Sequence, residues 1–187
     1  MIRSFIAIEI PKVIRDKIAD LQYELRRIPA QVSWVKPKNI HVTLKFLGEI
    51  QESLVPRIEE MLQEISAKTV PFEIMIEETG FFPNARRPRV LWVGVHEEDR
   101  HLSRFFAEIE RGLLPLGFAN EKRGFKPHLT IGRVRHPGGI EEIISKMQEG
   151  SFQAQSFLAQ EVVFVKSTLK PTGAEHEPLG KFRFKTD

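Results

Sequence analysis

Two four-residue runs in the sequence share one pattern, in which a histidine and a threonine alternate with two apolar residues. Residues 41–44 read His-Val-Thr-Leu, and residues 128–131 read His-Leu-Thr-Ile. Successive side chains of a β-strand point to opposite faces. His41 and Thr43 would therefore share one face of a strand, while the apolar pair anchors the other face in a core. Each run thus predicts a strand that presents an imidazole beside a hydroxyl.

The two runs lie almost half a chain length apart and have similar surroundings. Each comes soon after a Lys-Pro pair, Lys36-Pro37 or Lys126-Pro127, and each is followed by a segment with helical spacing of its apolar residues. One such run recurs easily by chance, but two with matching surroundings indicate a duplicated unit. We expect its halves to face each other and to bring both His-Thr pairs into one cleft.

The spacing of apolar residues divides the rest of the chain into strands and helices. Strand, helix, motif strand and helix occur in this order twice. Gly48 is expected to end the first motif strand. Ser53 and Asp99 are the expected N-caps of the second and third helices. Residues 80–88 are expected to form a loop that joins aromatic side chains to cations. The predicted strands are 2–9, 32–35, 40–47, 72–77, 90–95, 128–131, 152–158, 161–169 and 178–185, and the predicted helices are 11–25, 53–65, 99–113 and 140–147.

These elements predict an α+β fold with mostly antiparallel sheets, because several neighbouring strands read as hairpins. A chain of 187 residues makes one domain, or two small lobes that share a core. No separable linker interrupts it, so we expect a single domain over residues 1–187, with sequence halves of about 1–80 and 89–187.

Composition limits the partners and the kinds of site. A formal net charge of +3 permits a phosphate-bearing ligand without requiring one. Because cysteine is absent, the chain forms neither disulfides nor thiolate metal sites. The N-terminal apolar run is too short for a signal peptide, and no stretch approaches the roughly 20 apolar residues of a membrane span. We expect a cytoplasmic protein with no membrane partner.

The paired side chains suit chemistry at phosphorus. An imidazole titrates near neutral pH, so one histidine can take a proton from water while the other protonates a leaving oxygen. Threonine hydroxyls can donate hydrogen bonds to phosphoryl oxygens, and a nearby Arg or Lys adds charge-assisted binding. We expect neither a metal nor a cofactor, since no Asp or Glu stands at ligand spacing beside either motif and no phosphate-binding loop is present. The remaining histidines are expected at the surface: His96, His101, His136 and His176.

The two motifs and the runs around them resemble the 2H phosphoesterase superfamily, and within it the RNA 2′,3′-cyclic phosphodiesterase branch, once called 2′-5′ RNA ligases. The likeness covers nearly the whole chain. It rests on residues 3–8, 41–48, 80–84, 125–133 and 166–173. One departure lies at residues 173–176, which read Gly-Ala-Glu-His where many relatives continue Gly-Pro-x-Tyr.

The resemblance implies a bilobal fold with pseudo-two-fold symmetry, in which two sheets flanked by helices enclose a central cleft. It also implies hydrolysis of a terminal RNA 2′,3′-cyclic phosphate to a 2′-phosphate without a metal. By this resemblance His41 would be the proton donor to the leaving O3′ and His128 the proton acceptor that activates water, with Thr43 and Thr130 holding the phosphate. The near symmetry of the motifs leaves the assignment of donor and acceptor open from the sequence alone.

Three further residues are candidates for binding substrate. Arg133 looks like the family's phosphate-binding arginine, although strict alternation would turn it away from His128 unless Gly132 marks a bulge. Phe82 is a candidate for stacking on RNA, and Lys126 for binding phosphate. The expected partner is RNA with a 2′,3′-cyclic phosphate end, such as a tRNA fragment, bound by a monomer.

The sequence is also compatible with other functions. The same site could serve a 2′-5′ RNA ligase that joins tRNA halves, or a hydrolase of cyclic nucleotides or of ADP-ribose cyclic phosphate. A module that binds RNA ends without catalysis is disfavoured, because binding alone would not need two titrating groups.

Overall fold

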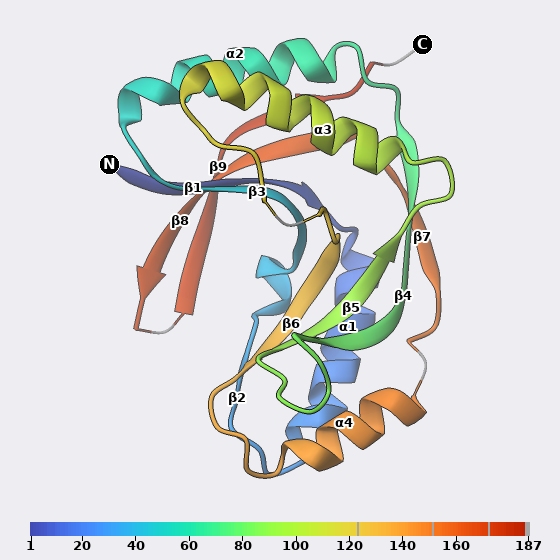
Figure 1. Ribbon diagram of the computed structural model, residues 1–187. Coiled ribbons are helices and arrows are strands. Elements are labelled where there is room, and N and C mark those ends of the chain that lie inside the picture. Colours follow the sequence, from blue (N-terminus) through green and yellow to red (C-terminus); the bar gives the residue numbers. More distant parts are fainter. Residues whose placement is uncertain (123, 151, 172, 186–187) are drawn as a thin grey trace.

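The computed structural model, which describes residues 1–122, 124–150, 152–171 and 173–185, arranges its strands in two antiparallel sheets (Figure 1). This confirms the predicted α+β fold. The first sheet has the order β3-β1-β8-β9, formed by His41–Ile50, Ile2–Glu9, Glu161–Lys170 and Gly173–Arg183. The second has the order β2-β6-β5-β4-β7, formed by Val32–Trp34, His128–Val134, Val90–His96, Phe72–Phe82 and Gln155–Ala159.

Helices cover one side of each sheet. Figure 1 shows α2 and α3 side by side along the first sheet, and α1 and α4 beside the second. The α-helices span Lys12–Arg26 (α1), Val55–Ser66 (α2), His101–Leu113 (α3) and Ile140–Glu149 (α4), and short 3-10 helices span Pro37–Asn39 (η1), Glu52–Leu54 (η2) and Leu114–Leu116 (η3). Across the described ranges, no helix is long and apolar enough to span a membrane.

The two sheets are built alike, which gives the fold its pseudo-two-fold symmetry. In each, a motif strand pairs with the strand that opens its repeat, β3 with β1 and β6 with β5. Further strands then extend the sheet, β8 and β9 beyond β1, and β4 and β7 beyond β5. Since β4 belongs to the first half of the sequence and β8 and β9 to the second, each sheet contains strands from both halves.

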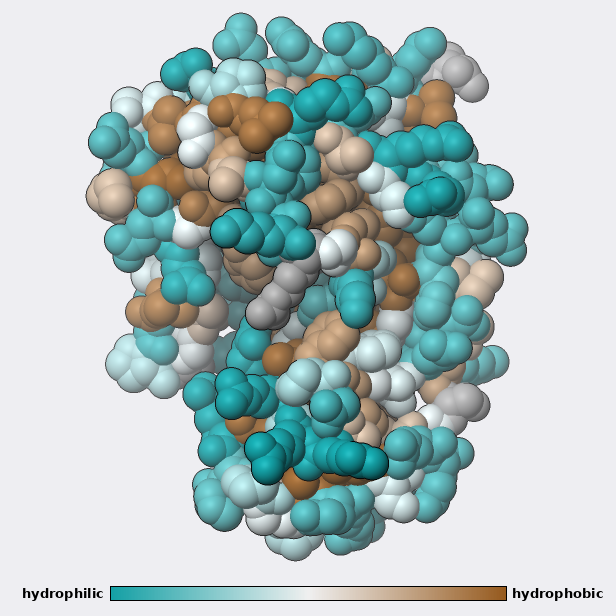
Figure 2. Space-filling model, viewed as in Figure 1, coloured by the Kyte–Doolittle hydropathy of each residue, from teal (hydrophilic) through white to brown (hydrophobic). Residues whose placement is uncertain are grey.

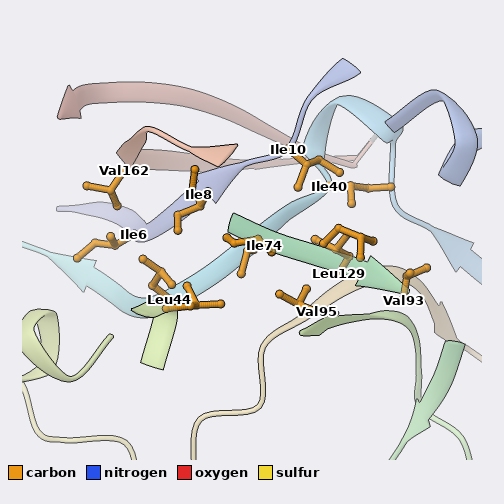
Figure 3. Packing of buried hydrophobic residues seen from close by; sticks show 14 of the residues in the cluster. Ile6, Ile8, Ile10, Ile40, Leu44, Ile74, Val93, Val95, Leu129 and Val162 are labelled. Atoms are coloured by element: carbon orange, nitrogen blue, oxygen red, sulfur yellow. The ribbon is translucent and has the colours of Figure 1, made fainter. Parts of the chain in front are cut away.

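One continuous core joins the two sheets. Figure 3 shows Ile6 and Leu44 of the first sheet packed in the same cluster as Ile74, Val93 and Leu129 of the second. The apolar residues of both motif strands lie in this cluster, as alternation predicts. Because the lobes share a core, the spacing of the two motifs is fixed by packing.

Two helix starts differ from the predictions. Ser53 does not cap α2, because the η2 turn intervenes and α2 begins only after Leu54. Asp99 does not cap α3. Instead the carboxylate of Glu97 accepts a hydrogen bond from the backbone N–H of Leu102 at 2.6 Å. A carboxylate at this position also offsets the positive end of the helix dipole.

Several strand ends also differ from the predictions: β7 begins at Gln155 rather than at residue 152, and β6 continues past residue 131 to Val134. β3 continues past Gly48 to Ile50, since Gly48 adopts a φ of +71° that glycine tolerates without strain. Residues 80–82 extend β4 rather than forming a loop, and Gly80 is required there because a Cβ atom would lie 2.2 Å from the Trp92 ring. β9 begins at Gly173, so the β8–β9 hairpin is longer than predicted.

Candidate active site

The two motif strands meet at a cavity of about 300 Å³. His41, Thr43 and Thr130 line it, together with residues of β2, β8 and β9. Figure 2 shows the surface hollowed between the β8–β9 hairpin at the left and the lobe of β2 and β6 below it. His128 is half-buried on the same face of β6 as Thr130, but it is not among the residues that line the cavity. The structure thus brings three of the four motif side chains, those of His41, Thr43 and Thr130, into one cavity wall.

Both motif strands carry a bulge at the last residue of their motif. Thr43 pairs with Ala7 and Lys45 with Ile6, so the intervening Leu44 has no partner of its own. On β6, Thr130 pairs with Trp92 and Gly132 with Leu91, which leaves Ile131 as the extra residue. A bulge changes the face to which the following side chains point.

The bulges redirect the side chains that follow. Arg133 lines the cavity, and the irregularity next to Gly132 that this orientation needs is confirmed. The bulge on β3 turns Lys45 away from the cavity. Alternation would place Lys45 on the same face as His41, but its side chain is buried beside Glu110, with Nζ 2.5 Å from the carboxylate. Phe46 then takes the cavity face.

The His128 ring is oriented by the backbone. Its Nδ1 lies 2.8 Å from the carbonyl oxygen of Lys126. A carbonyl can only accept, so Nδ1 carries the proton and Nε2 of the neutral ring keeps its lone pair. Burial lowers the pKa of His128, the bond to Lys126 opposes this change, and nearby Arg133 lowers the pKa further. The Lys126 side chain itself is exposed.

His41 lies between two other rings. It stacks on Phe5 with ring centroids 4.6 Å apart, and its centroid is 5.4 Å from that of His176. Burial lowers the pKa of His41 to about 4, proximity to His176 contributes in the same direction, and a hydrogen bond with the backbone of Asn39 opposes both. Each motif histidine therefore bonds the backbone two residues before it and is neutral at pH 7 in the free protein.

His176 was expected at the surface, and that expectation is wrong. It lines the cavity from β9, where it is half-buried with its ring edge-on to Phe5 at 5.0 Å. Burial and the charge of Lys38 lower the pKa of His176. The polar residues around it gave no strand signal, and only the register of the β8–β9 hairpin, which pairs it with Ser167, places it here.

Phe82 packs against His128, and neither side chain is among the residues that line the cavity. Its ring meets the His128 ring edge-on, with centroids 4.8 Å apart, and packs against Trp92 at 5.2 Å. Phe82 is therefore placed to hold the His128 ring, a contact that the sequence did not predict. Within the described part of the chain, no three His, Asp or Glu side chains gather in a metal-binding arrangement.

The fold and the candidate active site together indicate the class of protein to which this chain belongs. Two antiparallel sheets related by a pseudo-two-fold axis, each contributing a His-x-Thr strand to one cavity, are the features of a 2H phosphoesterase. A family model described as LigT-like phosphoesterase matches residues 8–92 and again residues 93–174, so each repeat matches once. The chain belongs to this family, which confirms the resemblance seen in the sequence.

Individual relatives are similar in sequence to this chain along nearly its whole length. An RNA 2′,3′-cyclic phosphodiesterase of Methanothermobacter thermautotrophicus is 34% identical over 97% of this chain and 98% of its own length. One of Archaeoglobus fulgidus is 37% identical over 96% of this chain and 99% of its own length. The crystal structure of a Thermus thermophilus protein, TT0787, superposes with a TM-score of 0.82 and 25% identity over 98% of both chains. That of E. coli LigT complexed with 3′-AMP has the same fold, with a TM-score of 0.80 and 21% identity over 99% of both chains.

Proposed function

We propose that the protein hydrolyses RNA 2′,3′-cyclic phosphate ends to 2′-phosphomonoesters, with His41 and His128 as acid and base. The single observation that carries this proposal is the cavity where the two His-Thr strands meet, with Arg133 in its wall. The names of the relatives from Methanothermobacter and Archaeoglobus, both RNA 2′,3′-cyclic phosphodiesterases, support the substrate class.

The proposed reaction displaces one oxygen at phosphorus by another. The free Nε2 of His128 takes a proton from water as the water oxygen bonds to phosphorus. The bond from phosphorus to O3′ breaks, and His41 gives its proton to that oxygen. Each proton transfer contributes roughly 10²–10⁴-fold to the rate. Solvent then restores the starting protonation of both rings.

Charge builds on the non-bridging oxygens as the new bond forms. Thr43 and Thr130 line the cavity from opposite strands, so their hydroxyls can donate hydrogen bonds to these oxygens from two sides. Arg133 adds a guanidinium from β6, whose charge-assisted hydrogen bonds are stronger than those of neutral donors.

The acid role of His41 depends on substrate. With a pKa of about 4 in the free protein, this ring rarely carries the proton it must donate at neutral pH. A phosphodiester anion bound between His41 and Arg133 favours the imidazolium form and raises the pKa. Substrate binding and proton uptake by His41 are therefore linked in this scheme.

Product identity tests the proposal. The protein is incubated with a short RNA that ends in a 2′,3′-cyclic phosphate, and the products are identified by mass spectrometry and phosphorus NMR. We expect the mass of one added water and a 2′-phosphate, and expect His41→Ala and His128→Ala each to lower kcat by about 10²-fold or more. His136→Ala, at an exposed position outside the cavity wall, serves as the matched control. A 3′-phosphate, or a 2′-5′ linked ligation product from tRNA halves, would contradict it.

A further inference from the structure

The buried stripe of α1 contains one polar residue, Gln22. The other buried residues of this helix, Ile14, Ile18 and Leu25, are apolar and belong to the core, yet Gln22 is only 1% exposed. A buried amide lowers the stability of a fold unless its polar atoms are hydrogen-bonded. The partners of this amide therefore indicate what Gln22 does.

The amide of Gln22 donates to two backbone carbonyls beside the cavity. Its Nε2 lies 2.8 Å from the carbonyl oxygen of Val35 and 2.8 Å from that of Ile131. The backbone N–H of Val35 donates to the same Ile131 oxygen at 3.0 Å. One side chain thus joins α1 to the residue that follows β2 and to the extra residue of the β6 bulge.

The Ile131 peptide decides where the rest of β6 points. Ile131 is the extra residue of the bulge, and Arg133, two residues later, lines the cavity. The direction of the side chains after a bulge depends on its local geometry. Because the Ile131 carbonyl accepts from two donors, its peptide cannot rotate without breaking both hydrogen bonds. Val35, held by the same amide, lines the cavity as well.

We infer that Gln22 is a positioning residue that holds the β6 bulge in the form that turns Arg133 toward the bound phosphate, an inference that rests on the proposed function. Gln22 is not among the residues that line the cavity, so it acts only through the two carbonyls. Within the described ranges its Oε1 accepts no hydrogen bond, which destabilises the fold. A residue that only filled the core would avoid this cost, and local costs of this kind are expected at functional sites.

A double-mutant cycle separates positioning from packing. We measure kcat/KM for a short RNA that ends in a 2′,3′-cyclic phosphate, in wild type, Gln22→Met, Arg133→Ala and the double variant. Methionine has nearly the shape of glutamine but donates no hydrogen bond. Gln22→Met should lower kcat/KM by about 10-fold or more, because a small misplacement of a binding group can cost up to about 10²-fold. In the Arg133→Ala background the same substitution should lower kcat/KM by less than about twofold, since the group that it misplaces is absent.

The matched control is Ile18→Val, which truncates a fully buried side chain on the same helix, one turn before Gln22. It should lower the free energy of unfolding in urea but leave kcat/KM within about twofold of wild type, because it touches neither carbonyl. All assays contain trimethylamine N-oxide, which favours the folded state. If Gln22→Met does not fold by circular dichroism, Gln22→Leu takes its place in the cycle.

Two results overturn the inference while the proposed function stands. One is the same fold loss of kcat/KM from Gln22→Met with and without the Arg133 side chain, and the other is an unchanged kcat/KM in Gln22→Met. If the wild type does not hydrolyse the RNA, the proposed function fails by itself. The cycle is then run on the Kd for adenosine 2′-phosphate, measured by NMR titration. Gln22→Met should weaken this binding only where Arg133 is present, and equal weakening in both backgrounds would refute the positioning role.

Discussion

Replacing Glu110 by alanine should destabilise the protein by about 3–5 kcal/mol, because the ammonium group of Lys45 would stay buried without its counter-ion. Both side chains are only 9% exposed, and Nζ lies 2.5 Å from Glu110 Oε1. Among the described residues, Lys45 keeps one other hydrogen-bond partner, the carbonyl oxygen of Ala119 at 2.8 Å, which carries no full charge. The other carboxylate oxygen of Glu110 accepts a hydrogen bond from the backbone N–H of Glu121 at 2.6 Å, so this bond is also lost.

A double-mutant cycle, in which the free energy of unfolding of each variant is measured by urea denaturation, gives the coupling between Lys45 and Glu110. Lys45→Met combined with Glu110→Leu should recover most of the lost stability, since an apolar pair of similar volume often replaces a buried ion pair without cost. The exposed Lys12–Asp16 pair on α1 is the control, and Asp16→Ala should change stability by less than about 0.5 kcal/mol. A loss below about 1 kcal/mol for Glu110→Ala, or additive effects of the two substitutions, would refute the reasoning.

The same ion pair connects the two motifs through α3. Lys45 lies just after the first motif and holds Glu110, while Phe106 of the same helix stacks on Phe125 with ring centroids 4.1 Å apart. Phe125 precedes His128 by three residues. A loss at Glu110 should therefore lower kcat even where the variant remains folded.

Three further predictions concern the reaction. Burial lowers the pKa of both His41 and His128 below 6.5, so kcat/KM, which reports the free protein, should peak below pH 6.5. The kcat profile should peak at higher pH because bound phosphate raises the pKa of the acid, and coincident profiles would contradict this linkage. Phe82→Ala should lower kcat more than it raises KM in steady-state assays, because its ring contacts His128, whereas a raised KM alone would place Phe82 against RNA. Activity should survive dialysis against EDTA, since imidazoles carry both proton transfers, and a loss restored by zinc or manganese would disprove the acid–base scheme.

Local patterns were sufficient to predict most of the fold. Alternation in β3, β4 and β6 and helical spacing in α1 and α3 are set by which face must be buried, and a shared core enforces that face. The repeat was visible because both motifs recur with the same flanking elements. The helix starts were less predictable, since Glu97 caps α3 from outside the usual N-cap position.

Within the site, alternation placed the four motif residues correctly on their strands but failed beyond the bulges. A bulge depends on how two strands pair, which one strand's sequence does not record. Strict alternation would place Lys45 on the face of His41, but Lys45 is buried, whereas Gly132 offered a local signal that Arg133 would be redirected. His176 reaches the cavity through a hairpin register that is equally invisible in its own segment.

The division of roles between His41 and His128 is the central claim, and leaving-group rescue tests it most directly. The kcat of each alanine variant is measured with RNA that ends in a 2′,3′-cyclic phosphate and with an analogue in which sulfur replaces O3′. A thiolate is a far weaker base than an alkoxide and leaves without a proton. Both variants should lose about 10²-fold or more on the natural end, and the analogue should rescue His41→Ala but not His128→Ala. Rescue of His128→Ala alone would exchange the two roles, and full activity of either variant on natural RNA would contradict the two-histidine mechanism.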